Sequence, residues 1–181
     1  MLSFALFAFI TSITPGPNNA LLMASGVRFG VKQTLPHLFG INLGFGLMFL
    51  IVGSVLPLLP EGSLEYLNWV AIALLLYIAV KIATASTSFE EQSITEKPWG
   101  FFRAAAFQWI NPKALMMAFA GATSYGLDNV TGAIIFTATN TVCGTWIFAG
   151  AWMRHFLIDN PVRTRILYIC LSLLMVLSII L

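Results

Sequence analysis

Two short clusters of proline, glycine and asparagine interrupt the apolar runs of this sequence. Pro15-Gly16-Pro17-Asn18 lies inside the apolar stretch 2–25, and Asn111-Pro112-Lys113 lies inside 101–127. Proline has no N–H and clashes with the preceding helical turn, so each cluster predicts a local opening of the backbone. A half-helix that begins near Asn18 would point free N–H groups and a positive dipole end at an anion such as a carboxylate. The carbonyl groups released before the break would accept hydrogen bonds from an ammonium group, so the pattern suits a small zwitterion.

A lysine and several asparagines are the polar side chains that accompany these breaks. Lys113 is the only charged residue well inside an apolar run, where a lysine costs about 2.5–3.5 kcal/mol and is functional by default; the alternative is a side chain that snorkels to the interface. Asn42 follows Pro15 by 27 residues and Asn140 follows Pro112 by 28, although interhelical hydrogen bonding alone would explain either asparagine. The candidate substrate-binding residues are therefore Pro15, Gly16, Pro17, Asn18, Asn42, Asn111, Pro112, Lys113 and Asn140.

The composition places these residues in a membrane protein. Of 181 residues, 59% are hydrophobic and 9% charged, against about 25% charged in soluble domains. A membrane-spanning helix needs about 20 mostly apolar residues, and six segments qualify: 2–25, 35–59, 64–84, 101–127, 130–152 and 165–181. We therefore expect an all-α polytopic membrane protein with one transmembrane domain, residues 1–181, made of two three-helix halves, 1–86 and 99–181. Five helices with a re-entrant first segment are the main alternative.

The basic residues predict the orientation of these segments. Eight of the nine Lys and Arg residues fall in the first, third and fifth connectors or at their edges, and none in the second or fourth. Short cytoplasmic loops retain Lys and Arg, so both termini are expected outside the cytoplasm. The halves then insert with opposite orientation, each with a broken first helix. This is the signature of inverted-repeat transporters with a site near the midplane. His37 is expected at the cytoplasmic interface, and Gly40 and Gly44 predict close helix packing or, as an alternative, a homo-oligomer.

Several classes of function are disfavoured by what the sequence lacks. No Asp or Glu lies within a predicted span, so a strongly cationic solute would meet no buried carboxylate, and proton coupling would use Lys113, His37, backbone or water. A net charge of +2 without a basic stripe excludes nucleic acid as a partner. Neither cofactor nor metal site is expected, and the two cysteines are interpreted as small buried hydrophobic residues. An enzyme would need convergent acid–base groups, and the predicted spans contain no Asp or Glu to supply them. A channel or a membrane assembly subunit is the alternative to a transporter.

The same motifs resemble a known family. Residues 13–19, Ile-Thr-Pro-Gly-Pro-Asn-Asn, followed by Gly26, Gly30, Gly40 and Gly44, resemble the lysine/threonine exporter (LysE/RhtB) family, and Asn111-Pro112-Lys113 is similar to its second motif. Residues 77–86, 97–98 and 107–108 are similar to the cysteine/O-acetylserine exporter branch. The resemblance implies export of a small neutral amino acid or derivative, threonine/homoserine-like or cysteine/O-acetylserine-like. It also implies protons as the coupling ion and a bacterial inner membrane, and it carries candidate roles to residues 15–18 and 111–113.

Overall fold

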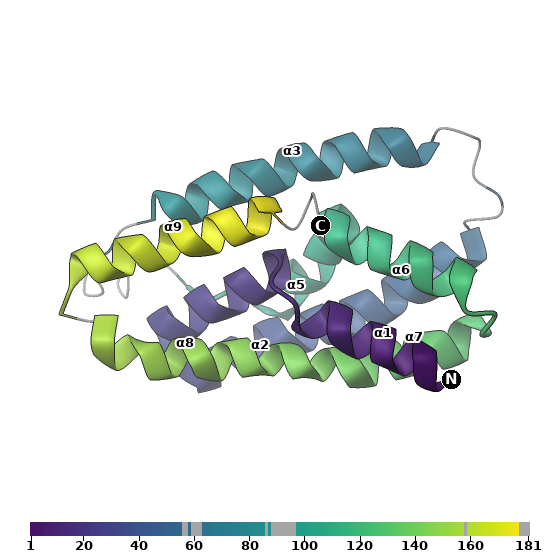
Figure 1. Cartoon of the computed structure of the whole chain (residues 1–181), viewed down its shortest axis with the longest axis horizontal. Helices are drawn as coiled ribbons and strands as arrows, with labels where there is room; N and C mark the ends of the chain where they lie inside the picture. The colour runs from purple at the N-terminus through teal and green to yellow at the C-terminus, as the bar shows by residue number, and fades with distance from the viewer. Residues whose placement is uncertain (56–57, 59–62, 86, 88–96, 158, 178–181) are drawn as a thin grey trace.

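The fold of the described residues is entirely helical. A computed structural model describes residues 1–55, 58, 63–85, 87, 97–157 and 159–177. Its elements are α1 (Leu2–Ile13), α2 (Pro17–Val55), α3 (Ser63–Ala83), α5 (Phe101–Phe107), α6 (Pro112–Ser124), α7 (Asn129–Asn140), α8 (Gly144–Leu157) and α9 (Pro161–Leu177), with 3₁₀ turns η2 (Gln108–Ile110) and η3 (Thr141–Cys143). Figure 1 shows that the helices run along the long axis of the molecule.

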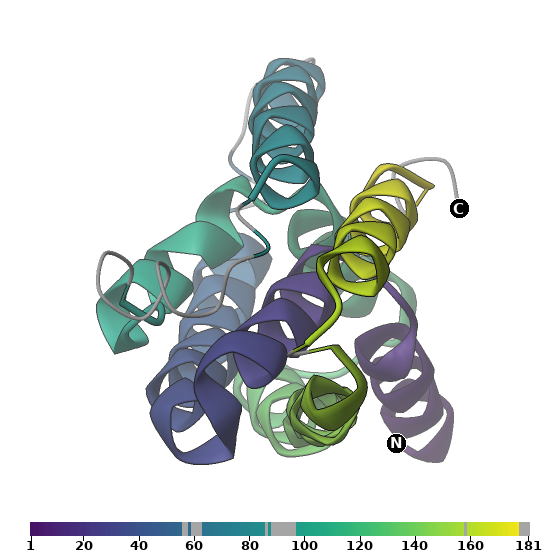
Figure 2. The ribbon, with the colours of Figure 1, turned by 90° about the vertical axis from the view of Figure 1, so that its left-hand side faces the viewer.

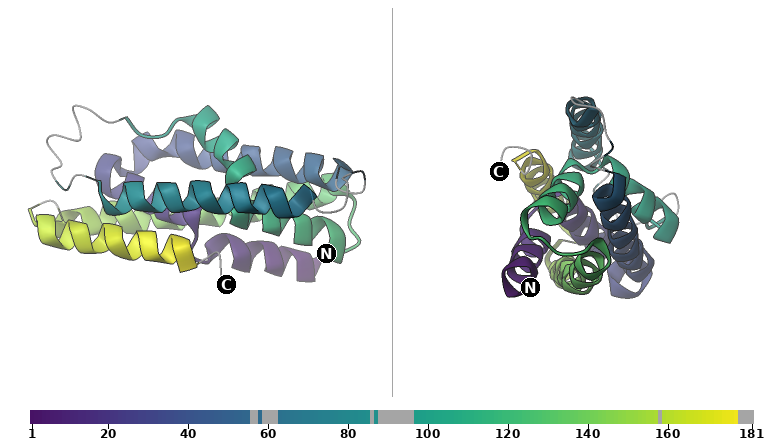
Figure 3. Two further views of the ribbon diagram at one scale, coloured as in Figure 1. Left: turned by 90° about the horizontal axis from the view of Figure 1, so that it is seen from above. Right: turned by 90° about the vertical axis from the view of Figure 1, so that its right-hand side faces the viewer.

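Helix α2 is two helices joined at a reversal of the chain. Gly30 has φ 77° and ψ 179°, a backbone conformation that a side chain would disfavour. The first arm of α2, residues 17–29, and the second arm, residues 31–55, therefore fold back on each other (Figure 3). The hydroxyl groups of Ser25 and Thr34 join the arms across the turn at 2.8 Å. The reversal keeps the start of the first arm deep in the bundle.

Three long helical passes are interrupted in their middle. The first interruption, residues 14–16 between α1 and α2, lies where the sequence predicts it. The second begins earlier than expected: η2 and the extended Asn111 form it, whereas Pro112 and Lys113 already belong to α6. A third, η3 between α7 and α8, was not predicted. The boundaries of the other segments shift by a few residues, and α9 begins at Pro161 rather than at 165.

The surface of the bundle is apolar and part of its interior is polar. Along the second arm, every fourth residue from Leu35 to Val55 is an exposed hydrophobic side chain. Exposed apolar side chains recur on α7, α8 and α9, whereas asparagine, glutamine and serine side chains are buried. A water-soluble monomer rarely exposes such continuous apolar surface, and lipid removes its cost. By length and composition, Pro17–Val55 and Asn129–Leu157 are the described stretches long and apolar enough to cross a membrane, although Pro17–Val55 reverses direction at Gly30. The interrupted α1, α5 and α6 are each too short alone.

The second arm is held closely against α5, as the glycine spacing predicts. A Cβ atom at Gly44 would lie 2.5 Å from Cα of Ala105, and one at Gly40 would collide with the backbone of Phe101. His37 lies near the start of the second arm and is only 1% exposed, because its ring stacks on Trp99 with centroids 5.4 Å apart. Its placement at the cytoplasmic interface of the membrane stays a prediction. Close backbone approach thus places the second half of the chain directly on the first.

The basic residues gather at one end of the long axis. Arg28 and Lys32 flank the reversal at Gly30, and the remaining basic residues except Lys113 lie at the same end, on α5, on the ends of α3, α8 and α9 or, for Lys97, just before α5 (Figure 1). Asp128, before α7, lies at the opposite end. Helix α3 packs beside α9 on the outside of the bundle (Figure 2). Lys113 is left alone between the two ends, next to the first interruption.

Candidate functional site

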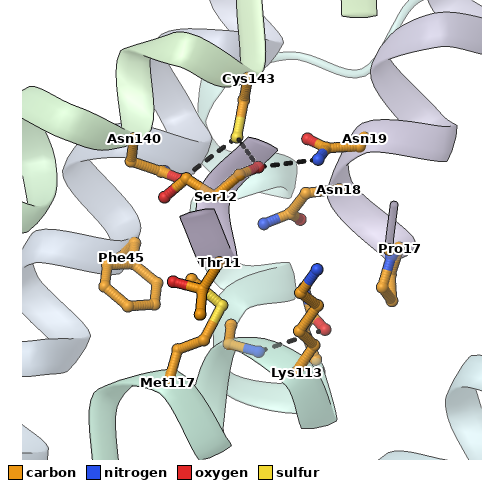
Figure 4. A pocket seen from close by; sticks show the side chains of 13 residues that line it. Thr11, Ser12, Pro17, Asn18, Asn19, Phe45, Lys113, Met117, Asn140 and Cys143 are labelled. Carbon is orange, nitrogen blue, oxygen red and sulfur yellow. Dashed lines mark hydrogen bonds between the residues drawn. The ribbon is translucent and has the colours of Figure 1, made fainter. Parts of the chain in front are cut away.

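A small polar cavity lies where the three interruptions meet. Its volume is about 20 Å³, room for about one water molecule. Figure 4 shows side chains from both halves of the chain pointing into it. The lining residues are Thr11, Ser12, Gly16, Pro17, Asn18, Asn19, Phe45, Asn111, Lys113, Ala114, Met117, Asn140 and Cys143. No carboxylate is among these lining residues: their polar groups are neutral apart from one amine, and Phe45, Ala114 and Met117 add apolar surface.

The first interruption releases a row of backbone carbonyl groups into this region. Pro17 has no N–H, and Thr14 is extended (φ −64°, ψ 146°), so the carbonyls of residues 12–15 lose their helical partners. Side chains from elsewhere donate to them instead. Asn19 Nδ2 donates to the carbonyls of Ser12 and Thr14 at 2.8 Å each. Trp146 Nε1 donates to Ile13 O at 3.1 Å. A polar break in the membrane must be satisfied in this way or by a ligand.

The Lys113 side chain completes this arrangement from the second half of the chain. Its Nζ donates to Thr14 O at 3.0 Å, to Thr14 Oγ1 at 2.8 Å and to Pro15 O at 3.0 Å. Lys113 is the second residue of α6, and Figure 4 shows its tip pointing into the cavity towards Asn18. The half-buried amine therefore does not snorkel to the interface. The carbonyls that the first helix releases bind an ammonium group.

A pair of side-chain amides connects the first two interruptions. Asn18 Nδ2 donates to Gln108 Oε1 at 2.8 Å, and Gln108 Nε2 donates back to Asn18 Oδ1 at 3.2 Å. Gln108 is fully buried and also donates to Ala104 O at 2.9 Å. Since Asn18 starts the first arm and Gln108 starts η2, any relative movement of the two broken passes would stretch this pair.

The third interruption carries a second polar pair. Asn140 Nδ2 donates to Asn42 Oδ1 at 3.0 Å, and both side chains are buried. The Cys143 thiol contacts Asn140 Oδ1 and the Ser12 carbonyl, each at 3.2 Å. Asn42 and Asn140 bind each other in this conformation, so a contact of either side chain with a substrate ammonium stays a prediction beside the backbone carbonyls described above.

The structure brings most of the predicted site residues together. Gly16, Pro17, Asn18, Asn111, Lys113 and Asn140 line the cavity, and Pro15 contributes its carbonyl. Asn42 stands behind Asn140, and Pro112 starts α6 without being one of the lining residues. Sequence reasoning did not select Ser12, Asn19, Gln108, Cys143 and Trp146. Their signal was available, since each is a polar or hydrogen-bonding residue in an apolar run, but their partners are set only by tertiary structure.

Some polar groups at the cavity remain open to a ligand. The buried Ser12 Oγ and Asn19 Oδ1 atoms have no hydrogen-bond partner among the described residues. The helix that starts at Pro17 also leaves the N–H groups of its first turn, at Asn18 and Asn19, without intrahelical acceptors. The free N–H groups of the helix start and the backbone carbonyl acceptors thus lie at the same interruption. This arrangement can bind a carboxylate and an ammonium of one small molecule.

A larger second cavity lies at the basic end of the bundle. Its volume is about 830 Å³, and it is lined by the first arm, α3, α5 and α9 together with residues 97–99 and His37 of the second arm. Arg28, Lys81, Lys97 and Arg103 are among its lining residues. An opening of this size is far larger than the polar cavity, and its charge would attract carboxylates.

Comparison with known proteins gives the family of this chain and two named relatives. The model of the family described as LysE type translocator matches residues 9–178. A protein of Salmonella paratyphi A named cysteine/O-acetylserine efflux protein is 29% identical over 159 residues, covering 82% of this chain and 80% of the relative. A protein of Escherichia coli (strain K12) with the same name is 30% identical over 148 residues, covering 80% of this chain and 69% of the relative. No solved structure gives a significant match. With the family match spanning nearly the whole chain, this protein belongs to the LysE type translocator family and is a membrane transporter, not an enzyme.

Proposed function

We propose that the chain is a secondary transporter that exports a small neutral amino acid or derivative from the bacterial cytoplasm. The observation that carries the proposal is the first interruption. It places ammonium-binding carbonyls and the free N–H groups of a helix start around one cavity. The α-ammonium and α-carboxylate of an amino acid match these two sets of groups, and half-helix termini are typical of such sites in transporters.

The proposed substrates are small zwitterions such as cysteine and O-acetylserine. The carboxylate would bind at the N–H groups of Asn18 and Asn19, and the ammonium at the carbonyls of Thr14 and Pro15. The lining residues include no carboxylate that could bind a basic side chain of the substrate, and only Lys113 could bind an acidic one. The names of the relatives support this substrate class. The site favours an uncharged side chain of small size.

The proposed architecture has six crossings in two inverted three-helix repeats. The crossings are α1 with the first arm, the second arm, α3, α5 with α6, α7 with α8, and α9, and Figures 1 and 3 show them alternating in direction. The basic end would face the cytoplasm, with both termini outside, and its large cavity would gather substrate carboxylates. Because the polar cavity is closed to an amino acid in this conformation, transport requires opening to each side in turn.

Protons are the proposed coupling ion. Lys113 and Cys143 are the titratable side chains among the lining residues, so proton exchange at the cavity would involve the lysine rather than a carboxylate. Reconstituted protein should accumulate substrate faster when an opposing proton gradient is imposed. Equal rates with and without the gradient would contradict proton coupling while leaving amino-acid transport intact.

Counterflow in proteoliposomes tests the transport function itself. We expect labelled O-acetylserine or cysteine to enter vesicles preloaded with the unlabelled compound, with saturable kinetics, and lysine and glutamate to compete poorly. Asn18→Ala should reduce the rate strongly, whereas Asn160→Ala, before α9 and outside the cavity, should not. Non-saturable flux or single-channel currents would instead support the channel alternative.

A further inference from the structure

The Lys113 ammonium uses all its hydrogen-bonding capacity on the first interruption. A lysine ammonium carries three N–H donors and no acceptor. Three acceptors receive it: the carbonyls of Thr14 and Pro15 and the hydroxyl of Thr14, at 2.8–3.0 Å. Among the described residues, Lys113 is the only donor to Pro15 O, whereas Thr14 O also accepts from Asn19. The site is therefore fully occupied by an ammonium group that belongs to the protein.

The Lys113 ammonium makes the same kind of hydrogen bonds as the α-ammonium of the proposed substrate. An α-ammonium also presents three N–H donors and no acceptor, so it requires the same set of oxygens. The cavity beside Lys113 holds about one water molecule, not an amino acid. The lysine stem also fills the space in front of the break, since a Cβ atom at Gly16 would lie 2.7 Å from Lys113 Cδ. Lys113 and a bound amino acid cannot occupy this subsite together.

We propose that Lys113 is an internal competitor that occupies the ammonium subsite in the empty transporter and leaves it when substrate binds. The proposal rests on the function proposed above, because it assigns the substrate ammonium to the carbonyls of Thr14 and Pro15. It makes Lys113 a specificity-determining residue: only a ligand that replaces the lysine's hydrogen bonds opens the site without leaving carbonyls unsatisfied. A direct role in binding the substrate carboxylate predicts effects of the opposite sign.

Replacement of the lysine separates the two roles. If the subsite is free in only a fraction of the protein molecules, the apparent affinity of the ligand is lower by that fraction. Removing the competing lysine should therefore tighten binding. Three charge-assisted hydrogen bonds must be replaced, and we expect Lys113→Met to lower the Kd for O-acetylserine roughly tenfold or more in purified protein. Lys32→Met, an exposed lysine near the Gly30 turn, should leave Kd unchanged. Weaker or unchanged binding by Lys113→Met would overturn the proposal.

Methylammonium tests the subsite without a carboxylate. In the Lys113→Met protein it should fill the vacated carbonyls, raise the melting temperature and compete with O-acetylserine. In the wild type it should do neither at the same concentration, because it lacks the additional contacts needed to displace the lysine. Tetramethylammonium has no N–H donor and serves as the ionic control. If methylammonium has no effect on the variant, or an equal effect on both proteins, the assignment of Lys113 is wrong.

A measurement on the wild type keeps the proposal testable if Lys113→Met fails to fold. Lys113 should react slowly with acetic anhydride in the empty protein and faster when O-acetylserine is saturating, with Lys32, which is exposed and lines neither cavity, as an internal reference. Ordinary binding residues show the reverse, protection by ligand, and protection would overturn the proposal. If the wild type binds no small zwitterion, the proposed function fails, and the methylammonium experiment alone decides whether the carbonyls accept a free ammonium.

Discussion

The two proline-containing breaks look alike in the sequence and differ in their chemistry. At the first, the carbonyls of residues 12–15 depend on side chains from three other places in the chain. At the second, the backbone is largely self-contained. There Pro112 begins α6 at a position that needs no N–H, and Asn111 caps the helix through Ala114 N at 3.5 Å. The first break is a set of acceptors, and the second contributes the donor, Lys113.

This difference shows how a repeated motif can form one asymmetric site. Two breaks with equal sets of free carbonyls would leave twice the number of polar groups to satisfy in the membrane. Here one break is closed by its own cap and delivers an amine to the other. The Asn18–Gln108 amide pair then couples the two. The consequence is that damage to the first break should cost more than equivalent damage to the second.

The largest difference is expected between Asn19→Leu and Asn111→Ala. Asn19→Leu removes two hydrogen bonds to the carbonyls of Ser12 and Thr14, at roughly 1 kcal/mol each, so the free energy of unfolding should fall by about 2 kcal/mol. Asn111→Ala removes one long capping bond and should cost about 0.5 kcal/mol, the low end for caps. Denaturant titration in detergent, followed by tryptophan fluorescence, measures both. Equal losses would contradict the asymmetry between the breaks.

The coupling between the breaks should appear in a double-mutant cycle. Asn18→Ala leaves the buried Gln108 amide without this partner, and Gln108→Ala leaves the half-buried Asn18 amide without it, whereas the double variant removes both, so the two effects should not add. We expect a coupling energy of about 1 kcal/mol, within the range for hydrogen-bonded neighbours. The pair Asn18→Ala with Asn160→Ala provides the additive control, because Asn160 lies at the start of α9. Additivity for Asn18 and Gln108 would mean that the amides do not connect the breaks.

The sequence predicted the location of the breaks better than their contents. Pro15, Pro17 and Pro112 lack an N–H wherever they occur, so the opening of the helix could be inferred from local chemistry. The identity of the donors could not, because Asn19 turns back to Ser12 while Trp146 arrives from the other half of the chain. A local pattern constrains the backbone near it, whereas the partner of a released carbonyl depends on helix packing.

Burial was subject to the same limit. The sequence places His37 at the cytoplasmic start of a span but does not indicate that its ring is buried against Trp99. The 3₁₀ turn at residues 141–143 contains no proline from which it could have been predicted. The prediction that Cys143 is buried is confirmed, but Cys170 is exposed on α9. In a membrane helix the buried face and the lipid-facing face are both apolar, so the sequence alone does not show which residues are buried.

A smaller effect is expected where the first break can exchange one donor for another. Cys143→Ser replaces a weak S–H donor to Ser12 O by a hydroxyl of similar size, and Ser12 O also keeps Asn19 as a donor. The free energy of unfolding should change by less than about 0.5 kcal/mol, and transport should persist. A matched Cys170→Ser variant controls for the loss of a thiol on the exposed surface. Loss of transport in Cys143→Ser alone would give the thiol a role beyond hydrogen bonding.

The smallest effect is expected at a second helix cap, Asp128, which is charged whereas Asn111 is neutral. Asp128 caps α7, accepting from Thr131 N at 2.9 Å, and this hydrogen bond lowers the pKa of the carboxyl below its usual value. A lowered folded-state pKa stabilises the protein above the unfolded value of about 3.9, and this contribution disappears as the pH falls through the folded pKa. Asp128→Asn keeps a capping oxygen without the charge, so its melting temperature should be slightly below that of the wild type at neutral pH and equal in acid. Because Asp128 is exposed, salt should reduce the difference further. A difference that persists in acid would show that geometry, rather than charge, distinguishes the two caps.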